Sequence, residues 1–132
     1  MIKEKVNKLD YFMSDDKGAF AGLHMILDMY DVEQLDQLEW IEKGLINAAK
    51  IANATIIHSH MHHFGHEQGV SGVVVLSESH ISVHSWPEKK YIAVDVFMCG
   101  NTKPQQAIDY LIDYFNAGSH KCSVIRRGDM NE

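Results

Sequence analysis

The feature that most constrains the fold is a run of four strand-like segments with no helical segment between them. They cover residues 54–64, 70–77, 80–86 and 91–99, and Pro87-Glu88-Lys89-Lys90 forms the turn between the last two. Connections this short join antiparallel neighbours, because parallel strands need a long crossover. The Val73-Val74-Val75 run indicates a strand buried on both faces. The sequence therefore predicts a mainly antiparallel sheet.

Two helices and two further strands complete the predicted order. Residues 23–30 and 121–127 are predicted as the first and last strands along the chain, and a helix is predicted between residues 36 and 53. Its apolar face consists of Leu38, Ile41, Leu45, Ala48, Ala49 and Ala52. A second helix begins at Pro104, and its buried stripe consists of Ala107, Leu111, Ile112 and Phe115. The order predicts an α/β (α+β) two-layer sandwich, with a mainly antiparallel sheet and the helices on one face.

The length of the chain predicts a single domain. The 132 residues are enough for one hydrophobic core. Residues 1–17 are polar, and we expect them to form a mobile N-terminal extension, with the domain covering residues 18–132.

Charge and hydropathy argue against several classes of protein. The net charge of -6 at pH 7 is unlike a general nucleic-acid surface, which is normally basic. No apolar run approaches the roughly 20 residues of a membrane span, and the N-terminus lacks the apolar core of a secretory signal. Cys99 and Cys122 do not suggest a disulfide framework, so we expect a cytoplasmic protein.

The hairpin around Pro87 brings reactive side chains together. If its turn is centred near residue 89, Ser79 lies opposite Cys99 or one position away, with His84 on the same hairpin. A hydroxyl, a thiol and an imidazole could then share one small site. Taken singly, such a serine is usually a turn former and such a cysteine a small buried hydrophobe. Their spacing alone indicates no more than a possible nucleophile site.

The segment from Gly69 to Gly100 resembles the short bacterial and archaeal S-adenosylmethionine decarboxylase proenzymes. The matching pieces are Gly-Val-Ser-Gly at 69–72, Ser-Glu-Ser-His at 77–80, His84, Trp86-Pro87-Glu88 and Cys99-Gly100. The resemblance extends more loosely from Gly22-Leu23-His24 to Arg126-Arg127-Gly128. It covers nearly all of the chain apart from the N-terminal extension.

This resemblance implies self-cleavage between Glu78 and Ser79. The Ser79 hydroxyl would attack the Glu78 carbonyl, and elimination would separate residues 1–78 from residues 79–132. Ser79 would become a covalent pyruvoyl group, an electron sink that forms a Schiff base with the substrate amine. In the family's pattern His84 is the base for processing, Ser71 supports that step, and Cys99 reprotonates the substrate's α-carbon. We see no use for the Cys99 thiol in cleavage itself.

The resemblance also implies a substrate and an assembly. Decarboxylated S-adenosylmethionine is the aminopropyl donor for spermidine synthesis. Phe64 would stack on adenine and Glu88 would bind the ribose hydroxyls, although Phe64 could equally be a core residue and Glu88 a solvated turn charge. The family's short members are dimers with sites shared between protomers, so we expect at least a homodimer.

Two departures from the family's pattern bear on the substrate. Leu23 stands where the family usually has an arginine, and residues 65–68 form a loop of four residues where three are typical. Some relatives on this scaffold decarboxylate arginine or ornithine, and that is the alternative function.

A group of histidines supports a different hypothesis. His58, His60 and His62 alternate, so a strand would place them on one face. Three imidazoles on one face suggest a metal-dependent hydrolase or a metal binder, but no HExxH or comparable motif accompanies them, and we expect no metal. A third hypothesis is an uncleaved regulatory homologue, against which the intact Glu78-Ser79, His84 and Cys99 argue.

Overall fold

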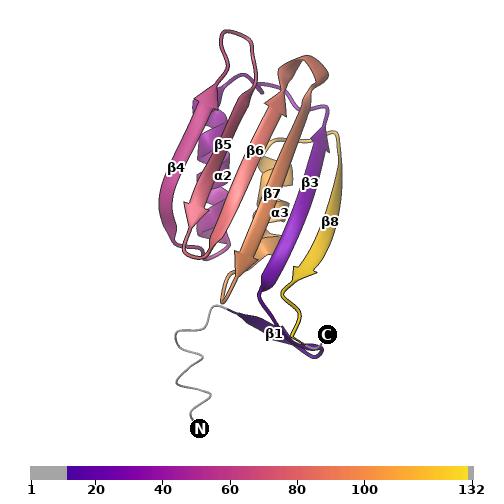
Figure 1. The fold of residues 1–132 in the computed structure, drawn as a ribbon. Coiled ribbons are helices and arrows are strands. Elements are labelled where there is room, and N and C mark those ends of the chain that lie inside the picture. The colour runs from indigo at the N-terminus through magenta and orange to yellow at the C-terminus, as the bar shows by residue number, and fades with distance from the viewer. Residues whose placement is uncertain (1–11, 131–132) are drawn as a thin grey trace.

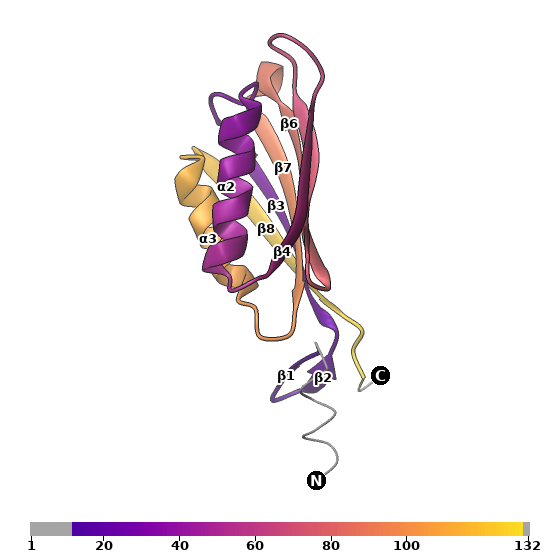
Figure 2. The ribbon, with the colours of Figure 1, turned by 90° about the vertical axis from the view of Figure 1, so that its left-hand side faces the viewer.

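The computed structural model describes residues 12–130, which form two layers (Figure 1). One layer is a six-stranded sheet in the order β4-β5-β6-β7-β3-β8. Every pair of neighbouring strands in it is antiparallel. The other layer is a pair of helices, and both cover the same face of the sheet (Figure 2). The predicted two-layer α+β sandwich is confirmed.

The predicted elements agree with the structure to within a few residues. The strands of the sheet are β3 Gly22–Tyr30, β4 Ile56–His63, β5 Val70–Leu76, β6 Ser79–Trp86, β7 Tyr91–Cys99 and β8 Ser119–Arg127. The helices are α2 Leu38–Ile51 and α3 Pro104–Tyr114, and a 3-10 turn, η1 Pro87–Lys89, joins β6 to β7. Phe115, which we predicted to lie on the buried stripe of the second helix, is its C-cap and is buried.

The core lies between the sheet and the helices because side chains alternate along each strand. In β6, Ile81 and Val83 point to the helices and are fully buried, while His84 and Trp86 are exposed on the opposite side. We call this second side, which carries no helix, the open face of the sheet. Among the described residues it exposes several large apolar side chains, including Ile26, Val75, Trp86 and Ile125. The expectation that the strand with the Val73-Val74-Val75 run is buried on both faces is wrong for this chain alone, because Val75 is exposed on the open face.

A small hairpin precedes the sheet. Its strands are β1 Met13–Asp15 and β2 Gly18–Phe20. Arg126 of β8 holds it, with its guanidinium 2.6 Å from the Asp15 carboxylate and its Cζ 3.9 Å from the centre of the Phe20 ring. This ion pair lowers the pKa of Asp15. This hairpin was not predicted, because its anchor is far away in the sequence. Residues 1–11 of the predicted mobile extension lie outside the described range.

Among residues 12–130, neither helix has the length and apolar character needed to cross a membrane.

Candidate active site

The Glu78–Ser79 peptide bond lies at the tight turn between β5 and β6. Leu76 pairs with Ser79, so only two residues connect the strands. Glu78 has a φ of 59°, in the left-handed region. For a residue with a Cβ this conformation costs roughly 1–2 kcal/mol. Ser79 follows it as the first residue of β6 and is only 8% exposed.

Cys99 contacts both reacting groups of this peptide. Its thiol donates a hydrogen bond to the carbonyl oxygen of Glu78, with an Sγ–O distance of 2.9 Å. The same sulfur lies 3.5 Å from the Ser79 hydroxyl, and the backbone N–H of Cys99 donates to that hydroxyl at 3.3 Å. The hydroxyl, the carbonyl and the thiol therefore form one group of contacts at the end of the sheet. The predicted proximity of Ser79 and Cys99 is confirmed, with β6 and β7 one position away from the assumed register.

Strand β3 and the turn after β7 fix Cys99 in this position. It pairs with Gly22 of β3, and a Cβ at Gly22 would collide with the carbonyl oxygen of Met98 and press against the Cys99 side chain. Thr102 donates a hydrogen bond of 2.8 Å to the carbonyl oxygen of Cys99. Leu23, where the family usually has an arginine, packs against the core and not on the open face.

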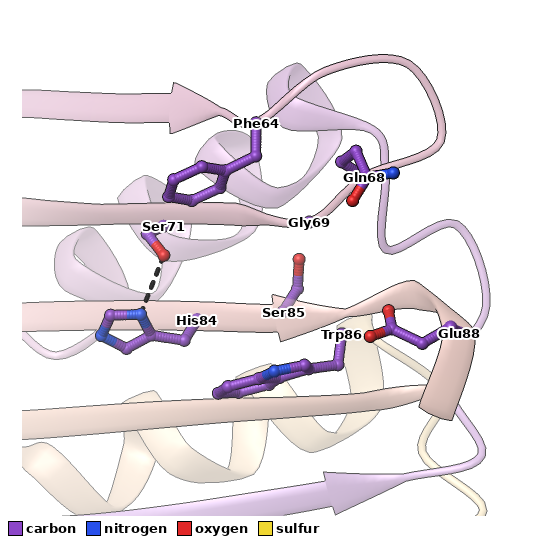
Figure 3. A pocket seen from close by; sticks show the side chains of 8 residues that line it. All are labelled: Phe64, Gln68, Gly69, Ser71, His84, Ser85, Trp86 and Glu88. Carbon is purple, nitrogen blue, oxygen red and sulfur yellow. Dashed lines mark hydrogen bonds between the residues drawn. The ribbon is translucent and has the colours of Figure 1, made fainter.

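A second cluster lies at the opposite end of the same sheet. It surrounds a pocket of about 320 Å³ (Figure 3). Within it the Ser71 hydroxyl lies 2.8 Å from Nδ1 of His84, across paired positions of β5 and β6. The structure therefore brings Ser71 and His84 together, as expected.

Aromatic rings border the pocket on two sides. Phe64 directly follows β4 and Trp86 ends β6, and Gly69, which has no side chain, directly precedes β5 between them. Phe64 is 61% exposed, so it is not the core residue that was the alternative interpretation. Glu88 completes the lining from η1. The two predicted binding residues thus share one pocket.

Four of the eight lining residues were not predicted as site residues, namely Gln68, Gly69, Ser85 and Trp86. Gly69 and Trp86 belong to the matching motifs, and Gln68 belongs to the four-residue loop. A signal for Trp86 was present: it is two positions from His84 on a strand, so both side chains had to be on the same face.

A buried serine holds this end of the sheet together. The Ser85 hydroxyl accepts a hydrogen bond of 2.9 Å from the N–H of Val70 and donates one of 2.7 Å to the carbonyl of Leu35. The backbone of Gly69 lies close to that of Ser85, and any side chain at this position would collide, because a Cβ would meet the carbonyl oxygen of Ser85. These contacts fix the strand ends that carry Ser71 and His84.

The two clusters are separate within one chain. Ser79 and His84 are five residues apart on β6, which corresponds to about 17 Å at the usual rise of ~3.4 Å per residue. Five is an odd number, so the two side chains also point to opposite faces of the sheet. The expectation that the imidazole shares the site of the hydroxyl and the thiol is therefore wrong for a single chain.

The three alternating histidines share one face of the sheet, as predicted, and this is the open face. His58, His60 and His62 are all exposed on β4. Alternate residues of a strand are roughly 7 Å apart, and within residues 12–130 no group of three or more His, Cys, Asp or Glu side chains is placed to hold a metal ion. The metal hypothesis therefore has no site to support it in this part of the chain.

A family model described as S-adenosylmethionine decarboxylase matches residues 23–128, which include both clusters. The chain belongs to this family.

Curated relatives and a solved structure agree with the family model. The chain is 41% identical over 116 residues to the S-adenosylmethionine decarboxylase proenzyme of Pseudomonas aeruginosa (strain LESB58), covering 86% of this chain and 72% of the relative. It is 43% identical over 110 residues to the proenzyme of Thermodesulfovibrio yellowstonii, covering 81% of each. The crystal structure of the adenosylmethionine decarboxylase of Aquifex aeolicus superposes with a TM-score of 0.74 at 39% identity, over 83% of this chain and 92% of that one.

Proposed function

We propose that this protein decarboxylates S-adenosylmethionine, using a pyruvoyl group that it forms from its own Ser79. The observation that carries the proposal is the contact of Cys99 with both partners of the cleavage reaction, the Glu78 carbonyl oxygen at 2.9 Å and the Ser79 hydroxyl at 3.5 Å. A decarboxylase acting on a free amine needs an electron sink, and Ser79 is placed to become one. The product is the aminopropyl donor for spermidine synthesis.

The processing chemistry follows from these contacts. The Ser79 oxygen attacks the Glu78 carbonyl carbon, and the peptide nitrogen leaves, which converts the amide into an ester. The Cys99 thiol donates to the carbonyl oxygen, where negative charge develops during the attack. A base then removes the α-proton of Ser79, the ester C–O bond breaks, and Glu78 leaves as a carboxylate that keeps the former serine oxygen. The remaining dehydroalanine gains water and loses ammonia to give the ketone.

The residues around Ser79 fit the group that this reaction produces. The thiol and the backbone N–H of Cys99 both contact the Ser79 side chain, so hydrogen-bond donors lie beside the residue whose Cα would carry the ketone. A pyruvoyl group would supply the electron sink for the electron pair that remains on the substrate's α-carbon when CO2 leaves. The Cys99 thiol, 3.5 Å from the Ser79 hydroxyl, would supply the proton to the α-carbon of the product. Because Cys99 must remain a free thiol, we place the reaction in a reducing compartment, the cytoplasm.

The pocket between Phe64 and Trp86 suits the adenosine part of the substrate. Phe64 and Trp86 border it on two sides, and a flat base can stack against these rings. The Glu88 carboxylate can accept hydrogen bonds from the two hydroxyls of a ribose. Arginine and ornithine have no flat ring to place there, so the aromatic pair favours S-adenosylmethionine over the alternative substrates.

A homodimer with the open faces in contact would unite the two clusters. Sheets pack face to face at about 10 Å, and the open face exposes apolar side chains that a partner would cover. His80 on this face is already partly desolvated, which, together with His24 nearby, lowers its pKa and favours the neutral form that burial requires. We propose a two-fold axis that runs across the strands near Ser82, midway between the clusters. The end of the sheet that carries the Glu78–Ser79 turn in one copy, with Cys99 on its open-face side, then lies against the Ser71–His84 pair of the other.

Co-expression of two inactive variants tests this shared site. We expect His84→Ala alone to cleave about 10²–10⁴-fold more slowly, because it lacks the processing base. In a mixed dimer with Ser79→Ala, the His84→Ala chain offers its Ser79 to the intact His84 of the other copy. A tagged His84→Ala chain should therefore regain cleavage when Ser79→Ala is co-expressed, as measured by denaturing mass spectrometry of the tagged complex.

The control for that experiment is His120→Ala, on the exposed strand β8, which should cleave normally by itself. A tagged His84→Ala chain that captures the Ser79→Ala chain yet stays uncleaved would show that His84 does not act across a dimer.

A further inference from the structure

The aromatic row continues beyond the pocket across the open face. Trp86 stacks on Tyr91 of β7, with ring centres 5.2 Å apart and an angle of 23°. Tyr91 stacks in turn on Tyr30 of β3, at 5.4 Å and 21°. These residues are direct cross-strand partners, since Trp86 pairs with Tyr91 and Tyr91 pairs with Tyr30. One face of the Trp86 indole is therefore backed by a second ring.

The backing ring is itself anchored. The Tyr91 hydroxyl donates a hydrogen bond of 2.6 Å to the carboxylate of Asp28, which lies on the neighbouring strand β3. This bond raises the pKa of Tyr91 to about 12, so the hydroxyl remains a donor throughout the neutral range. A hydrogen bond to a charged acceptor is among the stronger ones in proteins. The hydrogen bond fixes the tilt of the Tyr91 ring. Because Trp86 stacks on this ring, the orientation of the indole is restricted as well.

We propose that Tyr91 and Asp28 are positioning residues that hold the Trp86 indole in place for the base of the nucleoside in the pocket. The inference rests on the proposed function, because it assigns the slot between Phe64 and Trp86 to that base. Trp86 needs such support because its side chain is 40% exposed at the end of a strand. If the indole were free to rotate, ordering it on binding would cost conformational entropy and reduce the free energy gained from stacking.

Tyr91→Phe is the sharpest test because it keeps the stacked ring and removes only the hydroxyl. We expect KM for S-adenosylmethionine to rise roughly three- to tenfold, the range of one lost hydrogen bond. The value of kcat should stay within about twofold and cleavage of the chain should remain complete, because Tyr91 contacts neither Ser79 nor Cys99. Asp28→Asn keeps an acceptor oxygen without the charge and should give a smaller rise.

Tyr110→Phe is the matched control. Its hydroxyl also makes one part-buried side-chain hydrogen bond, accepting from Asn47 at 3.0 Å, but it lies in the helix layer. We expect an unchanged KM for this variant. An unchanged KM in Tyr91→Phe, or an equal rise in Tyr110→Phe, would overturn the proposal, and so would a loss of kcat without a change in KM.

A binding measurement separates this inference from the proposed function. The chain has two tryptophans, so Trp40→Phe leaves Trp86 as the sole indole fluorophore. Adenosine should quench its emission, and adding Tyr91→Phe should weaken that binding about as much as it raises KM. If the wild type does not turn over S-adenosylmethionine but this shift in binding is seen, the proposed substrate is wrong and the positioning role stands. If the shift in binding is absent, the positioning role is wrong whatever the turnover.

Discussion

Ser79→Ala should leave the protein as a single chain of 15.0 kDa with no decarboxylase activity. Alanine has no oxygen to attack the Glu78 carbonyl, and no other route leads to the ketone. The fold should be preserved, because the change removes one atom at the end of β6. The measurement is denaturing mass spectrometry after prolonged incubation, together with release of CO2 from S-adenosylmethionine.

Ser77→Ala is the matched control for that variant. It removes a hydroxyl from the same turn, two residues before Ser79, and should cleave and turn over normally. Cleavage of Ser79→Ala at the same bond would show that another group attacks the carbonyl. Full activity in the uncleaved variant would remove the pyruvoyl group from the reaction.

Cys99→Ala should damage both cleavage and turnover. The structure revises the expectation that cleavage has no use for this thiol, because Sγ donates to the carbonyl that is attacked. Removing one amide donor to a developing oxyanion typically costs about 10²–10³-fold in rate. A thiol is a weaker donor, so we expect cleavage to slow roughly ten- to a hundredfold. Turnover of the cleaved fraction should fall about 10²–10⁴-fold, the usual effect of losing a proton donor.

Cys99→Ser separates the two roles. A hydroxyl can still donate to the Glu78 carbonyl, so cleavage should recover at least in part, whereas turnover should stay low because a hydroxyl is a far weaker acid than a thiol. Cleavage rate and activity per cleaved chain are measured side by side. In Cys99→Ala, an N-terminal alanine on residues 79–132 after turnover would indicate a proton delivered to the wrong carbon. Wild-type turnover in either variant would leave the proton donor unassigned.

Much of the fold could be predicted because each element carries a local signal. The alternation in residues 91–99 and the turn at Pro87 define a hairpin whose register is nearly determined by its length. That register was enough to bring Ser79 and Cys99 together before the structure was known. The β1–β2 hairpin had no such signal, because its anchor, Arg126, is more than a hundred residues away.

The division of the candidate site into two clusters was not predicted. Membership of one hairpin was taken to imply one site, but the five-residue spacing of Ser79 and His84 places them far apart and on opposite faces. Strand spacing and alternation would have revealed this, had they been applied along β6 as well as across it. Trp86 was missed for the same reason. The proposed dimer contact could not be predicted either, because it depends on side chains from all strands of the open face and not on one segment of the sequence.

The central claim is self-cleavage followed by decarboxylation. It is tested most directly by denaturing mass spectrometry of the purified wild-type protein, before and after incubation with S-adenosylmethionine. The expected result is two chains, residues 1–78 and residues 79–132. The second should be lighter by one ammonia than the same chain with an N-terminal serine, and it should react with a hydrazine, as a ketone does. CO2 should be released from S-adenosylmethionine and not from arginine or ornithine. A protein that releases CO2 while its mass remains that of the intact chain would contradict the proposed origin of the cofactor.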